Sequence, residues 1–100
     1  MNKAMFVIVR DDLKTVGLKA AQGAHALAQH LIDYPNTQWK NNTLIFLKTE
    51  NIYTLYNIVD FLELKNKKYS TFYEPDLNNE LTAIAVYSER DNKFKKLKLL

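Results

Sequence analysis

Residues 4–12 read AMFVIVRDD, a run of six apolar residues followed by an arginine and two aspartates. A short, β-branched apolar run that ends in charged residues predicts a buried strand, and we place that strand over residues 4–10. The pattern turns helical from about Leu18 to Tyr34, and Pro35 disfavours helix in the residue before it. A buried strand that leads into a helix is a typical opening of an α/β domain.

The remainder of the chain repeats this alternation. Thr49 followed by Glu50 is typical of a helix N-cap with an acid in the first turn, and the apolar spacing after them predicts a helix to about Lys65. Three further strands are expected, over residues 43–47, 68–74 and 81–87. Helices between strands imply right-handed crossovers on a partly parallel sheet. We therefore expect one three-layer α/β/α domain over residues 1–100, with a mixed four-stranded sheet on which the C-terminal leucines dock.

The composition excludes several classes of protein. Of the 100 residues, 47% are apolar and 25% are charged, which is ordinary for a single soluble domain. The absence of cysteine excludes a disulfide scaffold, a thiol nucleophile and a thiolate zinc site, and two histidines are too few for a histidine-based metal centre. The longest apolar runs have the length of a strand, and acidic residues follow the first of them, so we expect neither a membrane span nor a signal peptide. These features predict a cytoplasmic protein without a bound metal.

The charge is modest and unevenly distributed. Fourteen basic residues against eleven acidic ones give a formal charge of +3. The lysines gather in two clusters, Lys65, Lys67 and Lys68 in one and Lys93, Lys95, Lys96 and Lys98 in the other. Such clusters contact phosphates or, more often, form a solvated surface. Both interpretations stay open from the sequence.

The predicted first helix has two arcs, since each residue turns it by about 100°. The broad apolar arc is expected to be buried against the sheet; it comprises Ala20, Ala21, Ala24, Leu27, Ala28 and Leu31. A separate narrow arc carries Gln22, His25 and Gln29, which either line a binding site or satisfy loop carbonyls around the helix. His25 has no second ligand at helical spacing and no nucleophile partner, so we expect a structural or substrate-positioning role for it.

Two parts of the chain carry a family resemblance. Residues 9–14 (VRDDLK), Gly17 and residues 20–26 (AAQGAHA) resemble the opening of the peptidyl-tRNA hydrolases of the archaeal and eukaryotic kind, type II. Residues 82–86 (TAIAV) and 96–100 (KLKLL) are similar to the strand and the terminus at the far end of that family. The resemblance spans essentially the whole chain.

This resemblance implies an enzyme that cleaves the ester between a peptide and the 3′-terminal ribose of tRNA, without a metal or organic cofactor. It implies tRNA as the partner and no membrane, and it leaves a homodimer open. Residues 74–80 (EPDLNNE) look like those of a shorter variety associated with phage genomes. The family machinery is a lysine at the start of the first helix, an aspartate after the third strand and nearby threonines. A carboxylate can orient or deprotonate water, and an ammonium can stabilise an oxyanion.

Carried onto this chain, the resemblance gives a catalytic set of Lys19, Asp76 and Thr82 and a substrate-binding set of Lys14, Gln22, His25 and Glu74. Leu18 stands where the family has its lysine, so Lys19 or Lys14 has to supply the ammonium. The family's Asp-Ala-Gly turn is absent, so Asp76 or Glu74 has to supply the carboxylate. We expect these side chains to converge on one cleft, where the start of the first helix meets the turn between the last two predicted strands.

Two other functions stay open from the sequence. One is a catalytically inactive module of the same fold that binds tRNA or a protein. The other is a related hydrolase of a small acyl or amide substrate. An open cleft with a basic rim would favour a tRNA ligand over a small substrate.

Overall fold

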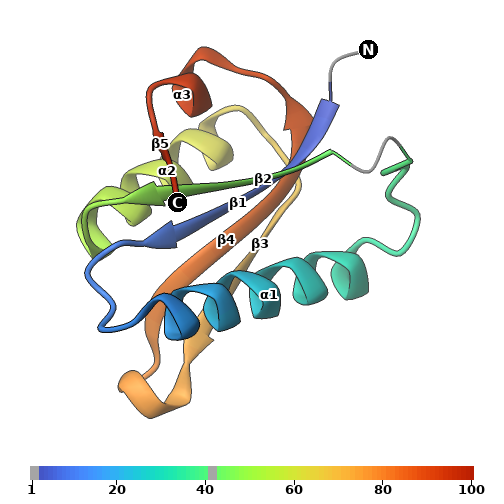
Figure 1. Cartoon of the computed structure of the whole chain (residues 1–100). Helices are drawn as coiled ribbons and strands as arrows, with labels where there is room; N and C mark the ends of the chain where they lie inside the picture. The colour runs from blue at the N-terminus through green and yellow to red at the C-terminus, as the bar shows by residue number, and fades with distance from the viewer. Residues whose placement is uncertain (1–2, 41–42) are drawn as a thin grey trace.

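A computed structural model describes residues 3–40 and 43–100 of the chain (Figure 1). Its elements, in order, are β1 (Lys3–Arg10), α1 (Val16–Asp33), β2 (Leu44–Thr49), α2 (Ile52–Leu64), β3 (Tyr69–Glu74), the short 3-10 helix η1 (Pro75–Leu77), β4 (Glu80–Glu89), α3 (Asn92–Lys95) and β5 (Lys98–Leu99). The radius of gyration of 12.5 Å is that of one compact domain of this length. No helix in the described ranges has the length and apolarity needed to cross a membrane.

The sheet is mixed and has the strand order β3-β4-β1-β2-β5. Strands β1 and β2 are parallel, joined by the crossover through α1, and the other neighbours are antiparallel. The predicted α/β class and mixed sheet are confirmed, but the predicted number of four strands is wrong. The fifth strand is the two-residue β5, which pairs with β2 at Leu47 and Lys48. The C-terminal tail therefore docks through backbone hydrogen bonds, and two residues are too short to show a strand period.

Alternate side chains of β1 belong to two hydrophobic clusters. Ala4, Phe6 and Ile8 pack in one cluster with residues of α2 and α3, among them Leu55 and Phe94. The residues between them, Met5, Val7 and Val9, pack in the other cluster with Ala26 of α1. Successive side chains of a strand point to opposite faces of its sheet, so α1 packs on one face and α2 and α3 pack on the other (Figure 1).

Helix α1 contacts the sheet through an arc that was not expected. Its buried residues are Gln22, Gly23, Ala26 and His30. A Cβ on Gly23 would lie only 2.5 Å from Phe46 Cε2 and 3.1 Å from Val7 Cγ1, so glycine allows the helix to approach this closely. The prediction of a buried alanine arc is wrong, because Ala20, Ala21, Ala24, Ala28 and Leu31 are all exposed. The buried arc mixes small side chains with two polar ones that form hydrogen bonds, and hydrophobic spacing does not detect such an arc.

Both long helices begin at residues other than those expected. Helix α1 begins two residues earlier than predicted, because the Thr15 hydroxyl accepts from Leu18 N at 3.0 Å and caps it. Helix α2 is capped by Asn51, whose Oδ1 accepts from the backbone N–H groups of Tyr53 and Thr54. The prediction of Thr49 as the N-cap is therefore wrong. Thr49 is the last residue of β2 and pairs with the last residue of β1, which leaves its hydroxyl without a capping role.

Candidate functional site

An irregularity at the start of β4 positions the first functional side chain. Phe72 pairs with Ala83 and Tyr73 with Leu81, so Thr82 is an extra residue between two pairs. Such bulges re-aim a side chain and are frequent beside active sites. Thr82 is fully buried, and its hydroxyl reaches Gln22 of α1.

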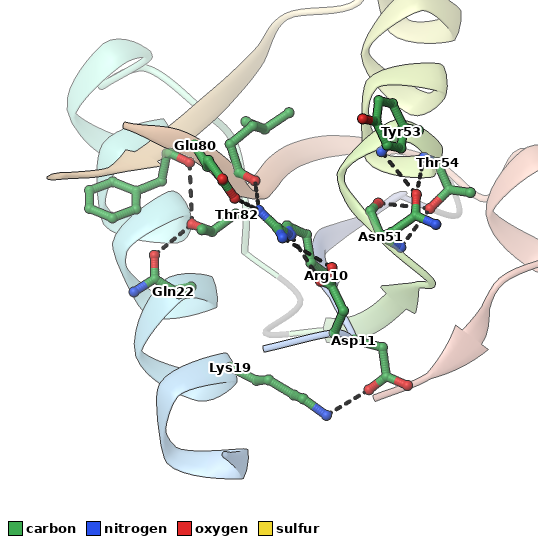
Figure 2. Close-up of polar contacts among 12 residues, drawn as sticks. Arg10, Asp11, Lys19, Gln22, Asn51, Tyr53, Thr54, Glu80 and Thr82 are labelled. Carbon is green, nitrogen blue, oxygen red and sulfur yellow. Dashed lines mark hydrogen bonds and ion pairs between the residues drawn. The ribbon is translucent and has the colours of Figure 1, made fainter. Parts of the chain in front are cut away.

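Gln22 joins three elements through its side-chain amide, and Figure 2 shows its contact with Thr82. Its Nε2 donates to Glu74 Oε1 at 2.8 Å, and its Oε1 accepts from Thr82 Oγ1 at 2.5 Å. A carboxylate only accepts hydrogen bonds, which fixes the amide nitrogen on the side of Glu74. Gln22 is 1% exposed, so both of its polar ends are used inside the protein. These contacts bring Gln22 of the first predicted helix together with Glu74 and Thr82 of the last two predicted strands.

Glu74 is the carboxylate that this chain of bonds orients. Its Oε2 also accepts from the backbone N–H of Asp76 at 3.1 Å. The hydrogen bond from Gln22, with help from that N–H and from the nearby His25, holds the pKa of Glu74 below its usual value. Glu74 is therefore an ionised, oriented carboxylate at the edge of a buried polar group.

Arg10 forms a second polar group at the end of β1. Its Nε and Nη2 donate to the two carboxylate oxygens of Asp12 at 2.9 and 3.0 Å, and its Nη1 donates to Glu80 Oε1 at 2.7 Å. The two-point contact with Asp12 contributes most to raising the pKa of Arg10 above its ordinary value. The sequence places Arg10 at the carboxyl end of a parallel strand, where α/β sheets bind ligands, but neither Arg10 nor Glu80 is in the predicted catalytic or substrate-binding set.

Lys19 is held by an acidic residue of the loop after β1. Its Nζ lies 2.7 Å from Asp11 Oδ1, and Lys48 Nζ lies 3.6 Å from the other oxygen of the same carboxylate. The hydrogen bond from Lys19 is the main cause that lowers the pKa of Asp11. Figure 2 shows Lys19 on α1 with its side chain directed toward Asp11. Lys19 thus places the predicted ammonium group one helical turn before Gln22, where it forms an ion pair with Asp11.

The other predicted residues lie at the margin of this group. His25 is exposed, and its ring stacks on Phe72 with a centroid distance of 4.4 Å and an angle of 5° between the planes. Lys14 and Asp76 are exposed, and none of the described hydrogen bonds or ion pairs connects either side chain to Gln22, Glu74 or Thr82. Of the two candidate carboxylates, the contacts therefore single out Glu74.

The polar groups around Gln22 combine a carboxylate with hydrogen-bond donors and positive charge. Over residues 3–40 and 43–100, the structure holds no group of three His, Asp or Glu side chains that could bind a metal ion. Gln22 and Thr82 hold Glu74 in place, Glu74 supplies a carboxylate, and Arg10 supplies positive charge. This set can orient water and stabilise negative charge.

Comparisons with known proteins give the fold and leave the activity open. No protein-family model and no curated protein matches the chain. Among solved structures, the chain is similar to a protein of unknown function from Agrobacterium tumefaciens strain C58. The two share 16% sequence identity and a TM-score of 0.74 over 100% of this chain and 98% of that one. The chain therefore has the same compact α/β fold as that protein over its whole length.

Proposed function

We propose that this chain hydrolyses peptidyl-tRNA, cleaving the ester between the peptide and the 3′-terminal ribose. The observation that carries the proposal is the hydrogen-bonded chain Thr82–Gln22–Glu74. Gln22 and Thr82 lie in the two segments that resemble the type II peptidyl-tRNA hydrolases, and they are bonded to each other across 60 positions. Their bond joins the two resembling segments at one place, and Glu74 adds a carboxylate to it.

In the proposed reaction, the Glu74 carboxylate orients a water molecule for attack on the ester carbonyl. The Lys19 ammonium, released from Asp11, stabilises the oxyanion, and Thr82 holds Gln22 in place. The bond between the carbonyl carbon and the ribose oxygen then breaks, and the ribose oxygen takes up a proton. The peptide leaves as a carboxylic acid, so atoms balance with water as the second reactant. His25 and Lys14, at the margin, contact the substrate.

The test is release of N-acyl amino acid from N-acyl-aminoacyl-tRNA by the purified protein, with and without EDTA. We expect release in both conditions. Glu74→Gln should lower the rate by about 100-fold or more, the usual contribution of a positioned acid or base. Asp76→Asn is the matched control and should keep most of the rate. Absence of release by the native protein would refute the proposal.

The alternative, a module of this fold that binds tRNA without cleaving it, is favoured by a specific observation. Both ends of the Gln22 amide and the Lys19 ammonium are already engaged within the protein. If the native protein binds tRNA with a salt-dependent affinity and releases no product, this alternative replaces the first proposal. Each phosphate contact removed by mutation should then flatten the slope of log affinity against log salt by about 0.7–0.9.

For the assembly, we propose a three-layer α/β/α domain that pairs with a second copy through the exposed face of α1. That face carries Ala20, Ala24 and Ala28 along its length and Ile32, which is 71% exposed, near its C-terminal end. Sedimentation should show a dimer that Ala24→Glu converts to a monomer. A monomeric native protein would refute the pairing.

The lack of cysteine supports a cytoplasmic location.

A further inference from the structure

Thr49 carries a buried polar atom that the fold does not use. The residue is 5% exposed, and among the described residues its Oγ1 is the buried side-chain oxygen or nitrogen without a hydrogen-bond partner. Leaving a buried hydroxyl unpaired costs about 1–3 kcal/mol, and such groups in a native fold call for an explanation. The capping role that the sequence suggested for Thr49 belongs to Asn51. A ligand bound beside Thr49 would therefore give this hydroxyl the partner that the fold does not supply.

Thr49 lines a cavity of about 420 Å³ at the carboxyl ends of the two parallel strands. Ligands of α/β sheets bind at this end. The charged residues of the lining are four lysines, Lys48, Lys93, Lys96 and Lys98, and two acids, Asp11 and Glu50. The balance of charge is positive. Three of the lysines come from the C-terminal cluster that the sequence left open between a phosphate patch and a solvated surface.

The cavity also has uncharged walls that suit more than a bare ion. Ile58 and Leu97 contribute apolar surface, and Thr54 and Asn57 of α2 contribute polar atoms. The first turn of α2 adds the positive end of its dipole, but Asn51 already caps the amides of Tyr53 and Thr54. Lys48 is already paired with Asp11, so the Thr49 hydroxyl and the three C-terminal lysines are the groups left to bind an anion directly.

We infer that this cavity binds a phosphate group carried by a ligand of about nucleotide size. Its volume lies in the range of about 300–1,000 Å³ that is typical of small-molecule sites. Lysines bind phosphate as compact positive charges, and a hydroxyl donates to a phosphate oxygen. The site goes beyond the proposed hydrolytic function, because its lining shares Asp11 with the Lys19 ion pair and includes none of Gln22, Glu74 and Thr82.

The experiment is a titration of the full chain with inorganic phosphate, a nucleoside monophosphate and a short RNA without terminal phosphates, followed by calorimetry and NMR. We expect the nucleoside monophosphate to bind more tightly than inorganic phosphate and to shift the amides around Thr49. Thr49→Val removes the hydroxyl at nearly constant shape, and Lys96→Ala removes one charge. Each should weaken binding about tenfold, the effect of about 1.4 kcal/mol.

Lys95→Ala is the matched control, because Lys95 is exposed next to Lys96 and does not line this cavity. It should change the affinity less than twofold. Equal weakening by Lys95→Ala would show diffuse attraction by the lysine cluster and overturn the inference, as would no binding tighter than about 10 mM. Preferential binding of the RNA would overturn the inference of a nucleotide-sized ligand and would assign the site to the phosphodiester backbone of a nucleic acid. Hydrolysis of peptidyl-tRNA is assayed separately, so either proposal can fail alone.

Discussion

Two polar groups lie near the same end of the sheet, on its two faces, and they differ in how they are satisfied. On the α1 face, the amide of Gln22 has a partner at each end, Thr82 and Glu74. On the α2 face, the Thr49 hydroxyl is as deeply buried and has no partner. The first group is surrounded by protein, and the second borders a cavity.

The difference teaches which groups hold the fold and which are free for a ligand. A buried polar group that is fully bonded fixes the position of the elements that it joins. A buried group left unpaired costs stability, and a ligand can recover that cost. We therefore expect substitution of the buried Gln22 to act mainly on stability, and substitution of Thr49 to act mainly on binding.

The largest effect is expected for Gln22→Leu, which removes both hydrogen bonds of the amide. Loss of a bond to a charged carboxylate and of a bond to a hydroxyl should lower the free energy of unfolding by about 2–4 kcal/mol, measured by urea denaturation. Gln29→Leu is the matched control on the same helix, since its bond to Asp33 is exposed; it should cost less than about 0.5 kcal/mol. Equal losses in the free energy of unfolding for the two variants would show that the hydrogen bonds of Gln22 stabilise the fold no more than an exposed bond does.

The close approach of α1 to the sheet is tested by Gly23→Ala. The added methyl would meet Phe46 and Val7, and overpacking of this kind costs about 1–3 kcal/mol. The better helix propensity of alanine offsets about 1 kcal/mol of that cost. Gly17→Ala, where a Cβ meets only the Thr15 hydroxyl at 4.0 Å, should stabilise the protein instead. A gain of stability at both positions would show that Gly23 is not a contact point.

A third polar group on the α1 face predicts a loss of stability in mild acid. The Ser70 hydroxyl donates to Asp33 at 2.7 Å, so it accepts from His30 Nδ1 at 3.2 Å, and burial lowers the pKa of His30 although Asp33 opposes the shift. As the pH falls, His30 is therefore protonated at a higher pH in the unfolded chain than in the folded protein. The free energy of unfolding has its full value above about pH 6.5. It falls by at most about 1.4 kcal/mol per pH unit as the pH drops toward the pKa of His30 in the folded protein.

The measurement is the free energy of unfolding between about pH 7.5 and about pH 5, a range that stays above the pH at which carboxylates protonate. His30→Gln should remove the acid-dependent part of the loss. His25→Gln, the same change at the other histidine, should keep it, because His25 is exposed on Phe72. An unchanged pH profile in His30→Gln would contradict the assignment.

The fold was largely predictable because its strongest signals are local. The apolar run of β1 and the turn residues between β3 and β4 indicate their elements without knowledge of distant contacts. The orientation of α1 could not be predicted in this way. Its apolar arc is exposed, and its buried arc depends on hydrogen bonds from Gln22 and His30 to residues at least 40 positions away.

The candidate site was predictable to a similar degree. Gln22, Thr82 and Glu74 were singled out, and the structure brings them into contact. The position of Arg10 at the end of the first strand pointed to the site, but its pairing with Glu80 could not be predicted, because the two residues are 70 positions apart and no local spacing relates them. Thr49 was predicted as a helix cap because threonine is a common N-cap residue. The pairing of β2 with β1 places Thr49 at the end of the strand, and Asn51 takes the capping role.

The smallest effect is expected for Thr49→Val without ligand, and it is the most direct test of the comparison. Valine keeps the shape of threonine and removes a hydroxyl that has no partner, so no hydrogen bond is lost. The free energy of unfolding should stay within about 0.5 kcal/mol of the native value or rise. Thr82→Val is the matched change at a bonded threonine and should cost about 1–2 kcal/mol, because it leaves the Gln22 carbonyl unpaired. If both variants lose the same free energy of unfolding, the Thr49 hydroxyl stabilises the folded protein as much as the Thr82 hydroxyl does. A loss confined to Thr82→Val leaves the Thr49 hydroxyl for a ligand.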